Sequence, residues 1–120
     1  MILVNTSVWV DHFRNGNSQL KDWLNANEVI VHPFVIGELA CGSMRNRSEV
    51  LSLLSELPEA IVADHEEVLN FVENNRLYAS GIGWIDAHII ASALLSKAKL
   101  MTLDKPLSKV ASVLGLHALK

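Results

Sequence analysis

Three acidic residues occur where the surrounding sequence is too apolar for ordinary surface charges. Glu38 interrupts an apolar segment, Asp86 lies near the start of the most apolar segment, and Asp104 directly follows a short apolar run. Asn5 follows a similar run at residues 2–4. Converging carboxylates would repel one another unless a cation held them, and such hard oxygen ligands suit Mg²⁺ or Mn²⁺ rather than zinc. If folding brings these side chains together, they predict a divalent metal site.

Each of these residues also has an explanation that needs no metal. Asp86 could be a first-turn acid that the helix dipole favours, and Asp104 could be a turn residue or a helix N-cap. Glu38 could extend from a helix edge into solvent, and Asn5 could simply cap the following helix. Only the set of four, taken together, favours the metal site.

The elements that must position these residues are short β-like runs alternating with helical segments. Strands are expected at residues 2–4, 28–31, 60–63 and 99–103, with 116–118 as a candidate fifth strand. Helices are expected at residues 7–14, 18–26, 33–44, 47–57, 84–98 and 106–114, and another begins at residue 64. This alternation predicts an α/β fold with a parallel sheet covered on both faces. In such sheets ligands bind at the carboxyl ends of strands, where Asn5 and Asp104 would lie.

Local signals place two of the helix starts. Pro33 belongs to the first turn of its helix, where the missing N–H costs nothing. Asp64 and Glu67 are three residues apart and have the pattern of a capping box. The apolar face of the helix that follows is expected to consist of Val68, Leu69, Val72 and Leu77.

The composition predicts one globular domain over residues 1–120. Hydrophobic residues make up 50% of the chain, which excludes a disordered protein. The net charge is −3, and the basic residues are scattered. Because a protein that grips a long duplex shows a basic stripe, any nucleic acid would be held through a few local contacts and metal ions. Arg14, Arg45 and Lys105 are candidates for phosphate contacts, unless each is only a solvated surface charge.

Nothing in the sequence suggests a membrane or an oxidising compartment. The apolar runs are shorter than the roughly 20 residues that a membrane span needs. The strand-like start has no basic region or cleavage site, which argues against a secretory signal. Cys41 is the only cysteine, so an internal disulfide is impossible. We therefore expect a cytoplasmic protein.

Four segments, in order along essentially the whole chain, resemble the motifs of the PIN domain family. Residues 2–11 resemble its opening, a hydrophobic strand followed by Asp-Thr/Ser-x-Val, and residues 35–39 (Val-Ile-Gly-Glu-Leu) resemble the motif that carries a glutamate. Residues 85–93 resemble the third motif, and residues 100–104 resemble the fourth, Thr-x-Asp after a strand. The first and third motifs are most similar to those of VapC-like toxins of toxin–antitoxin pairs.

The resemblance implies a three-layer α/β/α sandwich with four to five parallel strands and an acidic pocket for Mg²⁺ or Mn²⁺. It implies an endoribonuclease that hydrolyses RNA phosphodiester bonds, forms a homodimer and is blocked by a co-expressed antitoxin, through which it would reach DNA only indirectly. Carried over to this chain, the catalytic and metal-binding residues are Asn5, Glu38, Asp86 and Asp104. The hydroxyls of Ser7 and Thr102 are expected to orient carboxylates, unless Ser7 is a helix cap and Thr102 an ordinary strand residue.

One residue departs from the family pattern, because the family has Asp where this chain has Asn5. Asn keeps the shape and one carbonyl oxygen but loses the charge. Two unit charges about 4 Å apart interact by about 4 kcal/mol at an effective dielectric near 20, so metal binding and cleavage should be attenuated. The asparagine is either an introduced substitution that disarms a toxic enzyme, which the otherwise intact motif favours, or a natural attenuating residue.

Asn5 also supports a second hypothesis, in which the domain is catalytically silent. Its work would then be to bind an antitoxin and to regulate through that complex. An apolar groove for an amphipathic partner helix could be supplied by Trp9, Phe13, Phe34 and Ile36, unless these are ordinary core residues.

Overall fold

The computed structural model describes residues 1–118, in which three parallel strands form the central sheet. The strands are β1 (Ile2–Val4), β2 (Val29–Ile30) and β3 (Lys99–Met101), in the order β2-β1-β3. Leu3 of β1 pairs with Ile30 on one side and with Leu100 on the other. The helices are α1 (Thr6–Asn15), α2 (Ser18–Asn25), α3 (Pro33–Ala40), α4 (Arg47–Ser55), α5 (His65–Asn74), α6 (Trp84–Leu95) and α7 (Lys105–Val113).

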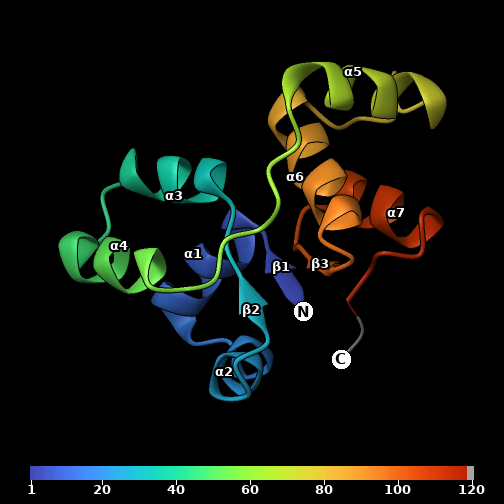
Figure 1. The fold of residues 1–120 in the computed structure, drawn as a ribbon. Coiled ribbons are helices and arrows are strands. Elements are labelled where there is room, and N and C mark those ends of the chain that lie inside the picture. Colours follow the sequence, from blue (N-terminus) through green and yellow to red (C-terminus); the bar gives the residue numbers. More distant parts are fainter. Residues whose placement is uncertain (119–120) are drawn as a thin grey trace.

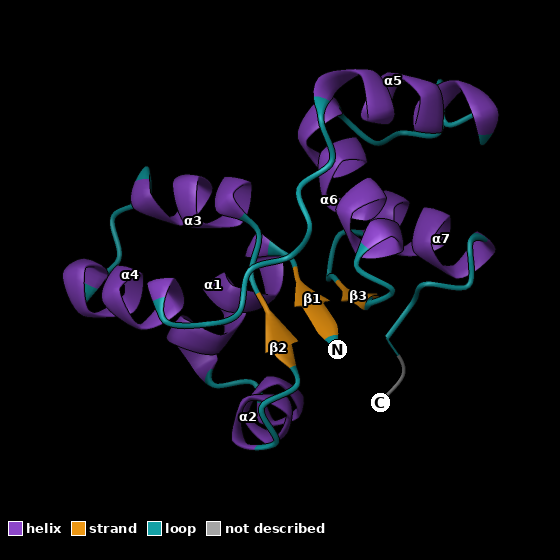
Figure 2. Ribbon diagram, in the orientation of Figure 1, coloured by secondary structure: helices purple, strands orange, loops and turns teal. Residues whose placement is uncertain are grey.

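The helices form a layer on each side of the sheet (Figures 1 and 2). Helices α1, α3 and α4 lie together on one side, where α3 packs against both α1 and α4. Helices α5, α6 and α7 lie on the other side, where α6 packs against α5 and β3. The expected three-layer α/β/α sandwich with a parallel sheet is thereby confirmed.

β1 and the middle of α6 have no polar face because they are buried in the core. β1 has a strand on either side and a helical layer above and below, and Leu3 and Val4 are fully buried. A helix that is apolar all round must be buried, and residues 87–93 of α6 are all buried. Within residues 1–118, no helix has the length and apolar character that crossing a bilayer requires.

The strand expected at residues 60–63 does not form. Its neighbour Glu59 makes a single parallel bridge to Val31, and the chain then leaves the sheet. The backbone N–H of Ile61 donates to Oγ of Ser96 at 2.8 Å, and that of Ala63 donates to Oγ of Ser92 at 3.2 Å. Because two serines of the α6 region take up these donors, the segment satisfies its backbone without a strand partner.

The candidate strand at residues 116–118 is likewise reduced to one bridge. The Leu100 N–H donates to the Leu116 carbonyl at 2.6 Å, and the Ala118 N–H donates to the Leu100 carbonyl at 2.9 Å. Within the described residues, these two hydrogen bonds form a single parallel bridge between Leu100 and His117. In the described residues the sheet has three strands, not the four to five expected.

Several helix limits also differ from the expectations. α3 ends at Ala40 rather than near residue 44, and α6 ends at Leu95 rather than residue 98. Lys97 has a φ of +53°, a left-handed conformation that ends α6. The expected capping box of α5 is confirmed, with the Asp64 N–H donating to Glu67 at 2.9 Å and the Glu67 N–H donating to Asp64 at 2.8 Å. On its apolar face, however, Leu69 is 43% exposed.

Candidate active site

Two of the four candidate residues meet at the carboxyl edge of the sheet. Asn5 follows β1 and is the N-cap residue of α1, and Asp104 follows β3 and is the N-cap residue of α7. β1 and β3 are neighbouring parallel strands, and the Asn5 N–H donates to the Met101 carbonyl at 2.9 Å. The strand order 2-1-3 reverses direction at β1, and such a switch point is where open α/β sheets bind ligands.

Asn5 is buried, with 7% of its surface exposed, and its side chain makes no hydrogen bond to the start of α1. The capping explanation for this side chain is therefore wrong. For Asp104 the capping explanation is right, because the Leu107 N–H donates to Oδ2 of Asp104 at 3.1 Å. That bond occupies one carboxylate oxygen, which leaves Oδ1 outside the cap.

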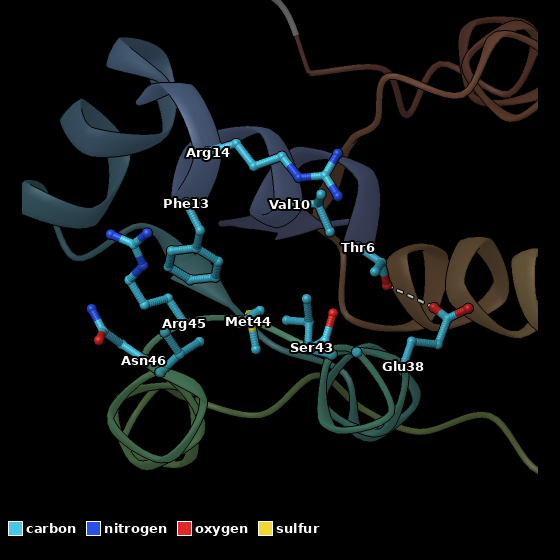
Figure 3. Close-up of a pocket in the computed structure, with 12 residues that line it drawn as sticks. Thr6, Val10, Phe13, Arg14, Glu38, Ser43, Met44, Arg45 and Asn46 are labelled. Carbon is cyan, nitrogen blue, oxygen red and sulfur yellow. Dashed lines mark hydrogen bonds between the residues drawn. The ribbon is translucent and has the colours of Figure 1, made fainter.

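Glu38 reaches the same region from α3. The hydroxyl of Thr6, the residue after Asn5, donates a hydrogen bond of 2.6 Å to Oε1 of Glu38 (Figure 3). This bond joins residues 32 positions apart in the sequence. It holds the Glu38 carboxylate beside the N-terminus of α1, and it was not anticipated from sequence.

Asp86 lies in the first turn of α6 and is half-buried. Burial is the main cause that raises its pKa, and a hydrogen bond from the Gly83 backbone opposes the shift. The negative charges of Asp104 and then Glu38 raise the pKa further. The charges of Asp104 and Glu38 thus act on the Asp86 carboxyl group, which links the acid of α6 to the other two.

The carboxylates do not, however, form a closed ligand set as they stand. Among residues 1–118, no group of three or more histidine, cysteine or acidic side chains is near enough together to hold a metal ion. The donor chemistry still fits a hard divalent cation, because the acids are neighbours whose charges repel one another. A cation would have to draw the side chains closer.

Ser7 and Thr102 hold the loop that carries Asp104. The Leu103 N–H donates to Oγ of Ser7 at 3.0 Å, and the Asp104 N–H donates to Oγ1 of Thr102 at 3.1 Å. The two hydroxyl oxygens are 3.4 Å apart. These hydroxyls thus act on the backbone of the loop, and Ser7, inside α1, is not the helix cap.

A ladder of aromatic rings joins α3 to α6. Phe34 lies between His32 and His88, with ring centroids 5.0 Å and 4.8 Å away, and Trp84 follows His88 at 4.7 Å. His32 is fully buried, and its Nδ1 accepts a hydrogen bond of 2.9 Å from the Phe34 N–H, which caps α3. Burial, reinforced by His88, lowers the pKa of His32 from 6.5 to about 4. The ladder fixes the helices that carry Glu38 and Asp86, and no local sequence pattern revealed it.

A cavity of about 730 Å³ opens beside Thr6 and Glu38, between α1 and the α3–α4 segment (Figure 3). Of the four aromatic or apolar residues proposed to line a partner groove, only Phe13 lines this cavity. Trp9 is a core residue with 1% of its surface exposed, and Phe34 belongs to the ring ladder.

Comparisons with known proteins agree with this geometry. A family model described as PIN domain matches residues 2–113. The protein named Ribonuclease VapC32 from Mycobacterium tuberculosis, in strains CDC 1551 / Oshkosh and ATCC 25618 / H37Rv, is 43% identical to this chain over 116 residues. The match covers 96% of this chain and 94% of the relative.

Proposed function

This chain belongs to the PIN domain family, and on that premise we propose that it is an endoribonuclease that depends on Mg²⁺ or Mn²⁺ and that Asn5 attenuates. We also propose that it is the toxin of a cytoplasmic toxin–antitoxin pair, forms a homodimer and is inhibited by a cognate antitoxin. The ribonuclease name of the similar protein supports the reaction. The observation that carries the proposal is the placement of Asn5 and Asp104 after the neighbouring parallel strands β1 and β3, next to Thr6, which holds the Glu38 carboxylate.

Glu38, Asp86 and Asp104 would supply the charged ligands, and the amide oxygen of Asn5 would be a neutral fourth. A bound divalent ion supplies two things to hydrolysis, a lowered pKa for an attacking water and stabilisation of charge on the phosphate. The repulsion between the three acids is what such a cation would relieve. These residues are therefore both the catalytic residues and the metal ligands of the proposed site.

Other residues of the chain would hold these ligands in position. Thr6 donates to Oε1 of Glu38, which leaves Oε2 outside that bond. Thr102 and Ser7 accept hydrogen bonds from the loop backbone and thereby fix the start of α7, where Asp104 lies. Burial and the charges of Asp104 and Glu38 raise the pKa of Asp86 above that of an ordinary aspartate. A bound cation would oppose this shift, because it favours the charged form of the carboxyl group.

The test is cleavage of a panel of single-stranded and structured RNAs by the Asn5→Asp variant. We expect this variant to cut RNA in Mn²⁺ much faster than the Asn5 protein, and to stop in EDTA. The matched control is Asn5→Asp combined with Asp86→Asn, which restores the original number of charges but replaces a different charged ligand with a neutral one. The proposal is refuted if neither the Asn5 protein nor the Asn5→Asp variant cleaves any RNA of the panel.

Asn5 itself favours a second function, a catalytically silent domain that binds an antitoxin and regulates through the complex. Metal titration separates the two functions. The silent domain predicts no Mg²⁺ or Mn²⁺ binding by the Asn5 protein, whereas the attenuated nuclease predicts weak binding that Asn5→Asp strengthens. Cleavage by Asn5→Asp that is lost with Asp86→Asn would instead support a nuclease site that Asn5 weakens.

A further inference from the structure

The cavity beside Glu38 runs away from the candidate active site along the outer helical layer. Thr6 and Glu38 line one end, while Phe13, Arg14 and Arg45 line its walls (Figure 3). Any chain that passes the candidate metal ligands could therefore continue into this cavity.

Two arginines from different elements face the cavity. Arg14 lies in the last turn of α1, and Arg45 lies in the loop between α3 and α4. Both side chains are exposed, and among residues 1–118 the arginine side-chain hydrogen bonds involve neither of them. Arg47 differs, because its Nε donates to the Ala40 carbonyl at 2.8 Å and so braces the loop. The guanidinium groups of Arg14 and Arg45 are thus free to bind an anion.

The charge of the lining matches a polyanion. Glu38 is the one acidic residue among the described residues that line the cavity, and it lies at the candidate active site. The third cation considered from sequence, Lys105, does not line the cavity. A strand whose reacting phosphate lies at the metal ligands would therefore place its next phosphates near two unpaired guanidinium groups.

Phe13 gives the cavity a rigid aromatic surface. Its ring stacks on Trp9, with centroids 5.8 Å apart and planes 21° from parallel, and Trp9 is buried. Figure 3 shows the Phe13 ring at the cavity, between Arg14 and Arg45. A positively charged groove with an aromatic platform is the combination that binds single-stranded nucleic acid.

We infer that this cavity holds the single-stranded RNA that flanks the scissile phosphate, with Arg14 and Arg45 on phosphates and Phe13 against a base. The inference rests on the proposed ribonuclease function and adds where the substrate lies. An RNA strand is favoured over an antitoxin segment because the cavity opens at the proposed metal ligands and combines unpaired cations with an aromatic surface.

The test is the salt dependence of RNA binding, measured by fluorescence anisotropy in EDTA with the Asn5 protein and a labelled single-stranded RNA. Each phosphate contact to a single strand contributes a slope of about −0.7 in log K against log salt. The Arg14→Gln/Arg45→Gln variant should therefore lose a slope of about 1.4. The matched control, Lys21→Gln/Lys109→Gln, makes the same change of charge at two exposed lysines outside the cavity and should keep the slope.

A second variant tests the aromatic surface. Phe13→Leu should weaken RNA binding by about 5- to 150-fold, the range for loss of one stacked base, and leave the salt slope unchanged. Circular dichroism and thermal melting establish that each variant is folded. Loss of RNA binding only in variants that have unfolded would count against the inference.

Other outcomes distinguish this inference from the proposed function. An unchanged slope in the arginine variant refutes the RNA path, while cleavage by Asn5→Asp would still support the ribonuclease. A reduced slope without cleavage by Asn5→Asp supports the RNA path and refutes the nuclease. If RNA binding is unchanged and the arginine variant loses only the cognate antitoxin, the cavity is a protein-docking site and the inference fails.

Discussion

Replacing Asn5 with Asp exchanges the side-chain amide nitrogen for an oxygen and adds one negative charge at the centre of the proposed site. At about 4 Å and an effective dielectric near 20, each unit of metal charge would gain about 4 kcal/mol from that carboxylate. Repulsion from the neighbouring acids, which already raises the pKa of Asp86, opposes this gain. The gain is reduced further because the new carboxylate would replace water that otherwise solvates the metal. We expect a net gain of about 1.4–2.8 kcal/mol, which is about 10- to 100-fold in affinity.

Isothermal titration of Mn²⁺ and Mg²⁺ into both proteins measures this gain. Asn70→Asp is the matched control, because it adds the same charge at an exposed position on α5. We also expect Asn5→Asp to release more protons on metal binding, since a fourth carboxylate raises the cluster's affinity for protons. Repeating the titration in buffers of different ionisation enthalpy counts those protons. Equal metal affinity in Asn5→Asp and Asn70→Asp would show that the residue 5 side chain is not a metal ligand.

Three further predictions concern residues that hold the site in place. In the Asn5→Asp background, Thr6→Val should lower Mn²⁺ affinity by about 10- to 100-fold because it frees the Glu38 carboxylate, while Thr6→Ser should retain affinity in the same titration. Asp104→Ala should lower the free energy of unfolding by about 1 kcal/mol through loss of the α7 cap. Asp104→Asn keeps a capping oxygen, so urea melts should show unchanged stability while titration shows a lower Mn²⁺ affinity. The His32 pKa is about 4 in the folded protein and 6.5 in the unfolded chain. Above pH 6.5 the ring is neutral in both states and the free energy of unfolding is at its full value, whereas at lower pH the unfolded chain binds the proton more readily. Stability should fall by about 3 kcal/mol between pH 6.5 and 4, and His32→Asn, which keeps a capping acceptor, should flatten that part of the profile in urea melts.

Local chemistry made part of the fold predictable. The capping box at Asp64 and the proline at the first turn of α3 involve neighbours in sequence, and both were found where expected. The strand at residues 60–63 failed for the opposite reason. Its backbone donors are taken by Ser92 and Ser96, about 30 residues away, and no pattern within the segment encodes that competition.

The site was predictable to a similar extent. Asn5 and Asp104 follow from the rule for the ends of parallel strands, because Asn5 comes directly after β1 and Asp104 comes three residues after the end of β3. Glu38 and Asp86 lie on helices, and only the family motifs indicated that they belong to the same candidate site. The sequence did not reveal the Thr6 hydrogen bond to Glu38 or the ladder of aromatic rings that includes His32. Both depend on how α3 packs against other helices.

The most direct test of the metal site is a crystal structure of the Asn5→Asp variant with Mn²⁺, located by its anomalous scattering. We expect Mn²⁺ at the carboxyl edge of the sheet, with oxygens of Glu38, Asp86 and Asp104 drawn in around it, bound directly or through water. Mn²⁺ bound elsewhere, or no ordered Mn²⁺ while these three side chains turn to separate surfaces, would contradict it.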